Sequence, residues 1–123
     1  MQAIATRNRV MSAATLSGYL VRNRDNEDVG SIEELMVDPD EGRVAYAVLS
    51  FGGFLGFGGR LHAVPWSALT LDAEERVFYL NVDKNTLESA PAFYEENWPD
   101  FTDREWGSRV HRHYGLSPHW QSA

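Results

Sequence analysis

The sequence predicts a mainly β domain, a small barrel or strongly curled sheet of five or six short strands, followed by a C-terminal helical tail. Two observations support this fold class. Through the first two thirds of the chain, short apolar or alternating runs are separated by tight turns. After that point the sequence becomes irregular and rich in aromatic residues, and it contains one amphipathic helical pattern. The 123 residues suit one domain with a single modest core.

The first strand is expected at residues 18–22. The polar turn that follows, residues 23–28, consists of residue types that form hydrogen bonds with their own backbone. The two segments predict a short strand that turns back into its neighbour.

The second strand is expected at residues 30–38, and its alternation breaks at Glu33 and Glu34. Ile32 and Leu35 can share one face of the sheet only if an extra residue is inserted between them. The sequence therefore predicts a β-bulge at the glutamate pair.

A tight hairpin follows at residues 38–42, because Pro39 and Gly42 suit a type I turn closed by a bulge. The strand after it, residues 43–51, is apolar on both faces. Such a strand is expected to lie inside the sheet and to be covered on both sides.

A further strand is expected at residues 60–64, where Pro65 ends it because proline removes a ladder donor. Residues 69–71 and 76–82 then read as a second hairpin around the acidic turn 72–75. These segments complete the predicted sheet.

The tail contains a capping-box pattern in which Thr102 is the expected N-cap and Glu105 the reciprocal partner. Trp106, Val110 and Tyr114 form an apolar stripe along the helix that follows. A helix this short needs to dock on something, either its own barrel or a second subunit.

The segment 52–59 consists of glycine and large apolar residues, Phe54, Leu55 and Phe57. Phosphate binding is not expected here, since a strand follows instead of a helix and no lysine is near. Two interpretations remain: a glycine hairpin packed against the barrel, or an apolar loop that contacts a partner.

The titratable residues do not form a catalytic or metal-binding pattern, and no cofactor is expected. His111 and His113 diverge on the predicted helix and cannot share a metal ion. His62 is expected to be partly buried, and the carboxylates of Glu33 and Glu34 are expected to be solvated.

Composition excludes several classes of function. The chain has no cysteine, so disulfides and thiol chemistry are absent. The net charge of −7 disfavours nucleic acid, and no apolar run is long enough to span a membrane. Acids dominate residues 25–96, which either keeps the protein soluble or provides an acidic docking face for a basic partner.

The motifs together resemble the PRC-barrel family, which includes the cytoplasmic domain of the photosynthetic reaction centre H-subunit and the C-terminal domain of RimM. The resemblance covers about residues 16–84, and the tail resembles a subgroup of stand-alone bacterial PRC-barrel proteins. It is carried by short motifs at Gly18–Val21, Gly30–Asp38, Gly42–Ser50 and Val64–Trp66.

The resemblance implies a small six-stranded PRC-type β-barrel that serves as a binding or assembly module and has no catalytic residues. The chain is therefore expected to divide into a disordered N-terminal tail at residues 1–15, the barrel at 16–84 and an aromatic-rich helical extension at 85–123.

The first functional hypothesis is a non-catalytic adaptor, cytoplasmic and homodimeric, that binds a protein partner of unknown identity and is not an enzyme. Large apolar side chains of the glycine-rich loop and the tail are its expected contacts. These residues are Phe54, Leu55, Phe57, Trp98 and Trp106.

The alternative hypothesis is a small-ligand or enzymatic role near Glu33, Glu34 and His62. It requires a pocket that brings these three side chains together.

Overall fold

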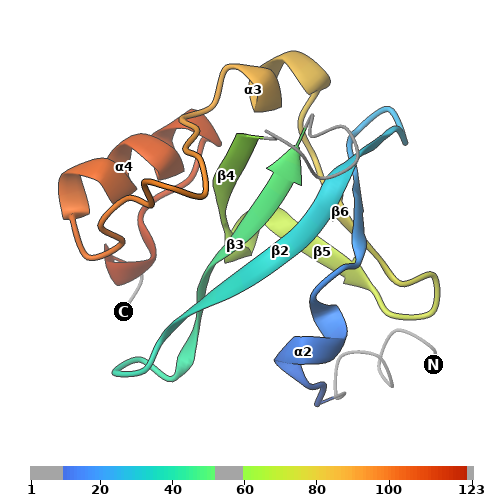
Figure 1. Ribbon diagram of the computed structural model, residues 1–123, viewed down its shortest axis with the longest axis horizontal. Helices are drawn as coiled ribbons and strands as arrows, with labels where there is room; N and C mark the ends of the chain where they lie inside the picture. Colours follow the sequence, from blue (N-terminus) through green and yellow to red (C-terminus); the bar gives the residue numbers. More distant parts are fainter. Residues whose placement is uncertain (1–9, 52–59, 122–123) are drawn as a thin grey trace.

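The computed structural model describes residues 10–51 and 60–121 (Figure 1). It contains one strongly curled six-stranded sheet that forms a half-barrel, which confirms the mainly β class with a helical C-terminal part. The strands are β1 (Leu20–Arg22), β2 (Asp28–Asp38), β3 (Arg43–Phe51), β4 (Arg60–Pro65), β5 (Leu69–Asp72) and β6 (Val77–Leu80). The helices are α2 (Ala13–Leu16), α3 (Lys84–Glu88), α4 (Arg104–His113) and the 3-10 turns η1 (Trp66–Ala68) and η2 (His119–Gln121).

The strand order is β4-β3-β2-β1-β6-β5. β1 runs parallel to β6, and all the other neighbouring strands are antiparallel. The sheet therefore joins a β2–β3–β4 meander to the β5–β6 hairpin through the short strand β1. Residues 13–15, in the segment expected to be a disordered tail, belong to α2.

The predicted bulge in β2 is confirmed. Ile32 faces Leu49 and Glu34 faces Val48, so Glu33 has no counterpart on β3. The extra residue lets the apolar residues on both sides of it point into the core.

The predicted tight hairpin between β2 and β3 is also confirmed. Asp38 pairs with Arg43, and the Gly42 N–H donates to the Asp38 carbonyl at 2.8 Å. Gly42 has φ 69°, a left-handed conformation that glycine adopts without strain. The Asp38 side chain accepts from the N–H groups of Asp40 and Glu41, which fixes the turn.

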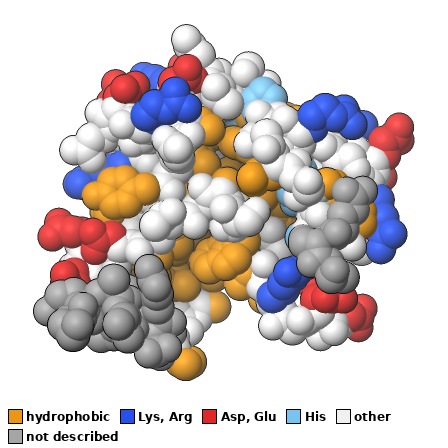
Figure 2. All heavy atoms as spheres, turned by 180° about the vertical axis from the view of Figure 1, so that it is seen from behind, with side chains coloured by type: hydrophobic (Ala, Val, Ile, Leu, Met, Phe, Trp, Pro, Cys, Tyr) orange, Lys and Arg blue, Asp and Glu red, His pale blue; other side chains and the backbone are white. Residues whose placement is uncertain are grey.

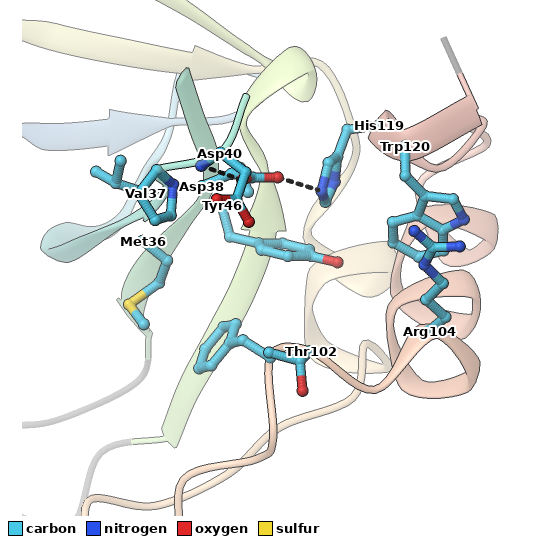
Figure 3. A pocket seen from close by; sticks show the side chains of 12 residues that line it. Met36, Val37, Asp38, Asp40, Tyr46, Thr102, Arg104, His119 and Trp120 are labelled. Atoms are coloured by element: carbon cyan, nitrogen blue, oxygen red, sulfur yellow. Dashed lines mark hydrogen bonds and ion pairs between the residues drawn. The ribbon is translucent and has the colours of Figure 1, made fainter. Parts of the chain in front are cut away.

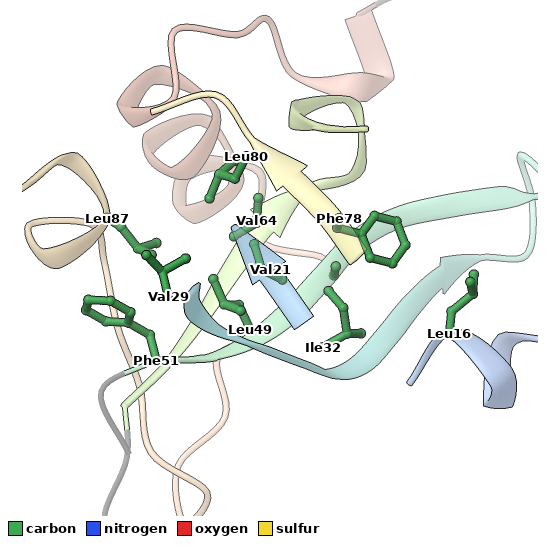
Figure 4. Packing of buried hydrophobic residues seen from close by; sticks show 11 residues of the cluster. Leu16, Val21, Val29, Ile32, Leu49, Phe51, Val64, Phe78, Leu80 and Leu87 are labelled. Carbon is green, nitrogen blue, oxygen red and sulfur yellow. The ribbon is translucent and has the colours of Figure 1, made fainter. Parts of the chain in front are cut away.

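Two apolar clusters cover the opposite faces of β3, as its two-faced apolar pattern predicted. The first lies inside the curl of the sheet (Figure 4) and includes Leu49 and Phe51. The second lies between the outer face and the C-terminal part and includes Tyr46 and Val48. Strict alternation along β3 would place Ala45 with Ala47 and Leu49, but Ala45 joins the second cluster because the register shifts again beside it.

α4 packs on the sheet of its own chain, where Val110 belongs to the second cluster. The N-cap expected at Thr102 is wrong by one residue. Asp103 caps the helix and accepts from the N–H groups of Glu105 at 2.9 Å and Trp106 at 3.4 Å. An aspartate is as good a cap as a threonine, so the pattern did not separate them.

The free edge of β4 is covered in part by the segment that leads to α4. Leu61 and Phe93 exchange both backbone hydrogen bonds, at 2.8 and 2.9 Å. The bridge ties the start of the extension to the barrel and leaves fewer unpaired groups on that edge.

Candidate functional site

A pocket of about 470 Å³ lies between the β2–β3 hairpin and the C-terminal extension (Figure 3). One side comes from the hairpin, and the other comes from the start of α4 and from η2. Its lining combines apolar, acidic and basic side chains. These residues are Met36, Val37, Asp38, Pro39, Asp40, Ala45, Tyr46, Phe101, Thr102, Arg104, His119 and Trp120.

Tyr46 forms the floor of this pocket and is only 1% exposed. Four other rings surround it with centroid distances of 5.4 to 5.6 Å, and they belong to Phe101, Trp106, His111 and His119. Edge-to-face and tilted pairs of this kind stabilise an aromatic cluster beyond simple burial.

The Tyr46 hydroxyl is buried and has no hydrogen-bond partner among the described residues. Burial raises the pKa of this phenol to about 12, so it stays protonated and can donate. In Figure 3 it points into the space between His119, Trp120 and Arg104. A buried, unsatisfied hydroxyl is costly, and a water molecule or ligand group that bonds it would remove this cost.

The close packing around Tyr46 depends on Gly107 in α4. A Cβ at this position would lie 2.7 Å from the Tyr46 hydroxyl and 2.8 Å from the Trp120 ring. The Gly107 carbonyl also lies 2.8 Å from Nδ1 of His111. Burial lowers the pKa of His111, so the neutral ring donates from Nδ1 to that carbonyl.

The arginines near the pocket contact neutral groups and keep their charge. Arg43 donates to the His119 carbonyl at 2.6 Å. The Arg104 guanidinium lies 5.3 Å from the centre of the Trp120 ring, a cation–π contact. Burial, then His111 and Arg43, lowers the pKa of His119 although Asp38 lies 4.0 Å away.

Acidic residues occupy both rims of the pocket. The hairpin rim carries Asp38, Asp40 and Glu41. On the α4 side, the exposed residues Asp100, Asp103 and Glu105 are next in sequence to the lining residues Phe101, Thr102 and Arg104, and the Asp103 carboxylate caps the helix. Hydrogen bonds from Thr102 lower the pKa of Asp100.

Trp98 and Trp106, the aromatic residues expected to contact a partner, have different environments. Trp98 is 37% exposed and packs beside Phe93 and Phe101, with ring centroids 5.1 and 6.1 Å apart. Trp106 is half-buried between Phe101 and Tyr46. Because Phe101 also lines the pocket, Trp98 extends the pocket into an exposed aromatic surface.

The other expected contacts, Phe54, Leu55 and Phe57, lie outside the described residues. The face opposite to that of Figure 1 has a hollow where apolar side chains reach the surface, with charged groups around it (Figure 2). We place the candidate site in the pocket because an apolar lining, nearby acidic residues and the buried Tyr46 ring meet there.

The alternative site does not form. His62 is 0% exposed and packs against Phe51 at 5.6 Å, whereas Glu33 and Glu34 are exposed. Burial, with Arg60 adding, lowers the pKa of His62 to about 4. A buried neutral imidazole and two solvated carboxylates cannot act together on one ligand.

The sequence did not single out Tyr46, Arg104, His119 or Trp120 as site residues. Their juxtaposition joins parts of the chain far apart in sequence, which no local pattern reports. Gly107, a glycine inside a helix, was the one local signal of a close approach.

Within residues 10–51 and 60–121, no group of three histidine, aspartate or glutamate side chains is placed to hold a metal ion. In the same part of the chain, no helix is long and apolar enough to cross a membrane.

When the chain is compared with known proteins, one protein-family model matches it. The PRC-barrel domain model matches residues 8–87, which include every strand and the hairpin side of the pocket. A solved structure of RimM from Pseudomonas aeruginosa, a candidate 16S ribosomal RNA processing protein, is 16% identical with a TM-score of 0.43. That match covers 61% of this chain and 45% of the other. A search of curated proteins found no match.

Proposed function

The chain belongs to the PRC-barrel domain family, whose barrels are protein-interaction modules, and from this premise we propose that it is a non-catalytic protein-binding module. The partner docks on the aromatic surface around Trp98 and in the pocket beside it. The observation that supports this best is the continuity of exposed Trp98, through Phe101, with that pocket.

Several features support binding rather than catalysis. Families with this domain are in general not enzymes. The polar groups around the pocket are turn caps, the His119–Asp38 pair, a cation–π pair and a buried phenol, and none of its lining residues is a serine, cysteine or lysine that could act as a nucleophile. An exposed tryptophan beside a pocket is typical of a contact that dominates binding energy.

The experiment is site-specific photo-crosslinking. Trp98 is replaced by photo-reactive benzoyl-phenylalanine, and the chain is irradiated in its native cell extract. Thr70, exposed on β5 away from the pocket, is the control position. We expect a discrete covalent protein adduct from position 98 and none from position 70. Equal labelling at both positions would exclude Trp98 as the docking surface.

The glycine-rich loop and a homodimer remain part of this proposal. A Phe54→Asp/Phe57→Asp variant tests the loop, because two added charges would weaken any apolar contact made there. The solution mass of that variant, compared with the unchanged chain, tests whether two copies associate through it. We also propose a cytoplasmic location, which fractionation of the native cells tests.

A further inference from the structure

We propose that the pocket between the β2–β3 hairpin and α4 binds a basic peptide segment that inserts one large apolar side chain between flanking lysine or arginine residues. The inference rests on the proposed function and adds the chemistry of the partner. The PRC-barrel match ends before α4, so one side of this pocket comes from residues beyond the family domain.

The negative charge near the pocket favours a basic peptide as the ligand. Acidic side chains stand on both rims, on the hairpin and at the start of α4. Arg43 and Arg104 contact neutral groups, the His119 carbonyl and the Trp120 ring, and keep their charge, but the carboxylates near the pocket outnumber them. The chain as a whole has a net charge of −7, so a basic partner is attracted at long range as well.

The apolar residues that line the pocket favour a large apolar side chain in the bound peptide. Val37 is 58% exposed although it is a large apolar residue, and half-buried Met36 and Phe101 lie beside it around the pocket. A volume of about 470 Å³ lies within the range of roughly 300–1,000 Å³ typical of binding pockets. A large side chain seated there would cover apolar surface that water now contacts.

The Tyr46 hydroxyl supplies a second and independent sign of a ligand. It is buried and unpartnered among the described residues, and it is enclosed by Gly107 of α4 and the Trp120 ring on one side of the pocket (Figure 3). A carbonyl oxygen of an inserted peptide would accept a hydrogen bond from it once the Trp120 ring moves aside. The free protein lacks this bond, and the complex would gain it.

A second copy of this chain is a poorer occupant. It would bring the same acidic rims and the same negative net charge to the contact, and like charges facing each other oppose association. The chemistry of the pocket therefore favours a different, basic protein.

The test is selection from a random heptapeptide library displayed on phage, panned against the full chain. We expect the enriched peptides to carry net positive charge around one large apolar residue. Affinities of synthetic copies are then measured by fluorescence anisotropy, and they should fall as salt is raised.

Two variants locate the site. Asp40→Asn/Glu41→Gln should weaken binding by about fivefold, and Glu74→Gln/Glu75→Gln, the matched removal of two exposed charges from the β5–β6 turn, should leave it unchanged. Tyr46→Phe should weaken binding by about threefold to tenfold without loss of thermal stability, because only an unpaired hydroxyl is removed.

Several results would overturn the inference. These are enriched peptides that are neutral or acidic, no enrichment above background, equal effects of the two charge-removing pairs, or self-association of the chain that Val37→Asp abolishes. If any of these occurs while position 98 still crosslinks a protein, the basic-peptide inference is wrong and the proposed binding function stands. Loss of the crosslink as well would remove both.

Discussion

Tyr46 connects the fold to the candidate site at the level of a single residue. Its ring belongs to the core cluster between the sheet and α4, and its hydroxyl is enclosed near Gly107 and Trp120 without a hydrogen-bond partner among the described residues. Burying a polar group unpaired costs stability that an apolar residue of the same shape would not. The residue is therefore better suited to a bound state than to the free protein.

Tyr46→Phe should leave the free energy of unfolding unchanged or raise it by up to about 1 kcal/mol, since no hydrogen bond is lost. Chemical denaturation of the two proteins measures the difference. A loss of more than about 1 kcal/mol would mean that the hydroxyl has a partner in the free protein.

For Gly107→Ala, the direction of the stability change tests how closely α4 packs on β3. In an exposed helix, Gly→Ala stabilises by about 1 kcal/mol. Here the added Cβ would meet the Tyr46 hydroxyl at 2.7 Å and the Trp120 ring at 2.8 Å. Gly107→Ala should therefore destabilise by about 1–3 kcal/mol, measured by denaturation. A stabilised variant would show that α4 does not approach β3 this closely.

Because the pKa of the buried His62 ring is lowered, we predict that the folded protein loses stability in acid. Its pKa in the folded chain, about 4, lies below the ordinary 6.5, so the unfolded chain takes up the proton first as the pH falls. Above pH 6.5 the ring is neutral in the folded and the unfolded chain, so His62 adds no pH dependence there. About 3 kcal/mol of stability is lost as the pH falls from 6.5 through 4.

His62→Leu should flatten this part of the stability profile, measured by denaturant titrations at several pH values. Burial also lowers the pKa values of His111 and His119, so a smaller acid dependence should remain. An unchanged slope in the variant would mean that His62 is not buried neutral.

At the level of elements, the sequence predicted the strands, the β2 bulge and the tight hairpin because each has a local cause. An alternation that slips at Glu33, or a Pro and a Gly at fixed turn positions, can be read without knowing the fold. The side of the sheet on which Ala45 lies could not be predicted, because nothing in the sequence of β3 marks the second register shift.

The candidate site was predicted only in part, since a pocket depends on contacts between distant elements. Trp98 was predicted to contact a partner, and it is 37% exposed. Its neighbours in the pocket come from β2, β3, α4 and η2, and no spacing in the sequence joins them.

The assignment of Asp103, in place of Thr102, as the N-cap of α4 can be tested by mutation. Asp103→Ala should destabilise the protein by about 1 kcal/mol, because it removes the acceptor for two helix N–H groups. Thr102→Ala should have a smaller effect, since the Thr102 hydroxyl only donates to Asp100. The two variants are compared by thermal denaturation. If Thr102→Ala destabilised the protein more than Asp103→Ala, Thr102 would be the N-cap instead.

At the level of the whole molecule, the half-barrel and its extension share a core. The second cluster joins β3 and β4 to Phe93, Phe101, Trp106 and Val110 of the C-terminal part. The bridge between Leu61 and Phe93 adds backbone hydrogen bonds to this contact. We therefore expect the extension to fold and unfold together with the barrel.

Val110→Ala should lower the stability of the whole chain by about 2 kcal/mol, because it leaves a cavity in this shared cluster. Tryptophan fluorescence, mostly from the extension, and far-ultraviolet circular dichroism should report one coincident transition in both proteins. An early fluorescence transition in the variant alone would show that the extension unfolds separately.

The central claim is that a protein partner binds where the hairpin meets the extension. The most direct measurement is calorimetric titration of the crosslinked partner, once identified, with Val37→Asp and with Leu20→Asp. Both substitutions place a charge on an exposed apolar strand residue, 58% and 43% exposed, but only Val37 lines the pocket. We predict at least a roughly tenfold loss of affinity for Val37→Asp and none for Leu20→Asp. Equal affinities for the two variants would contradict the account.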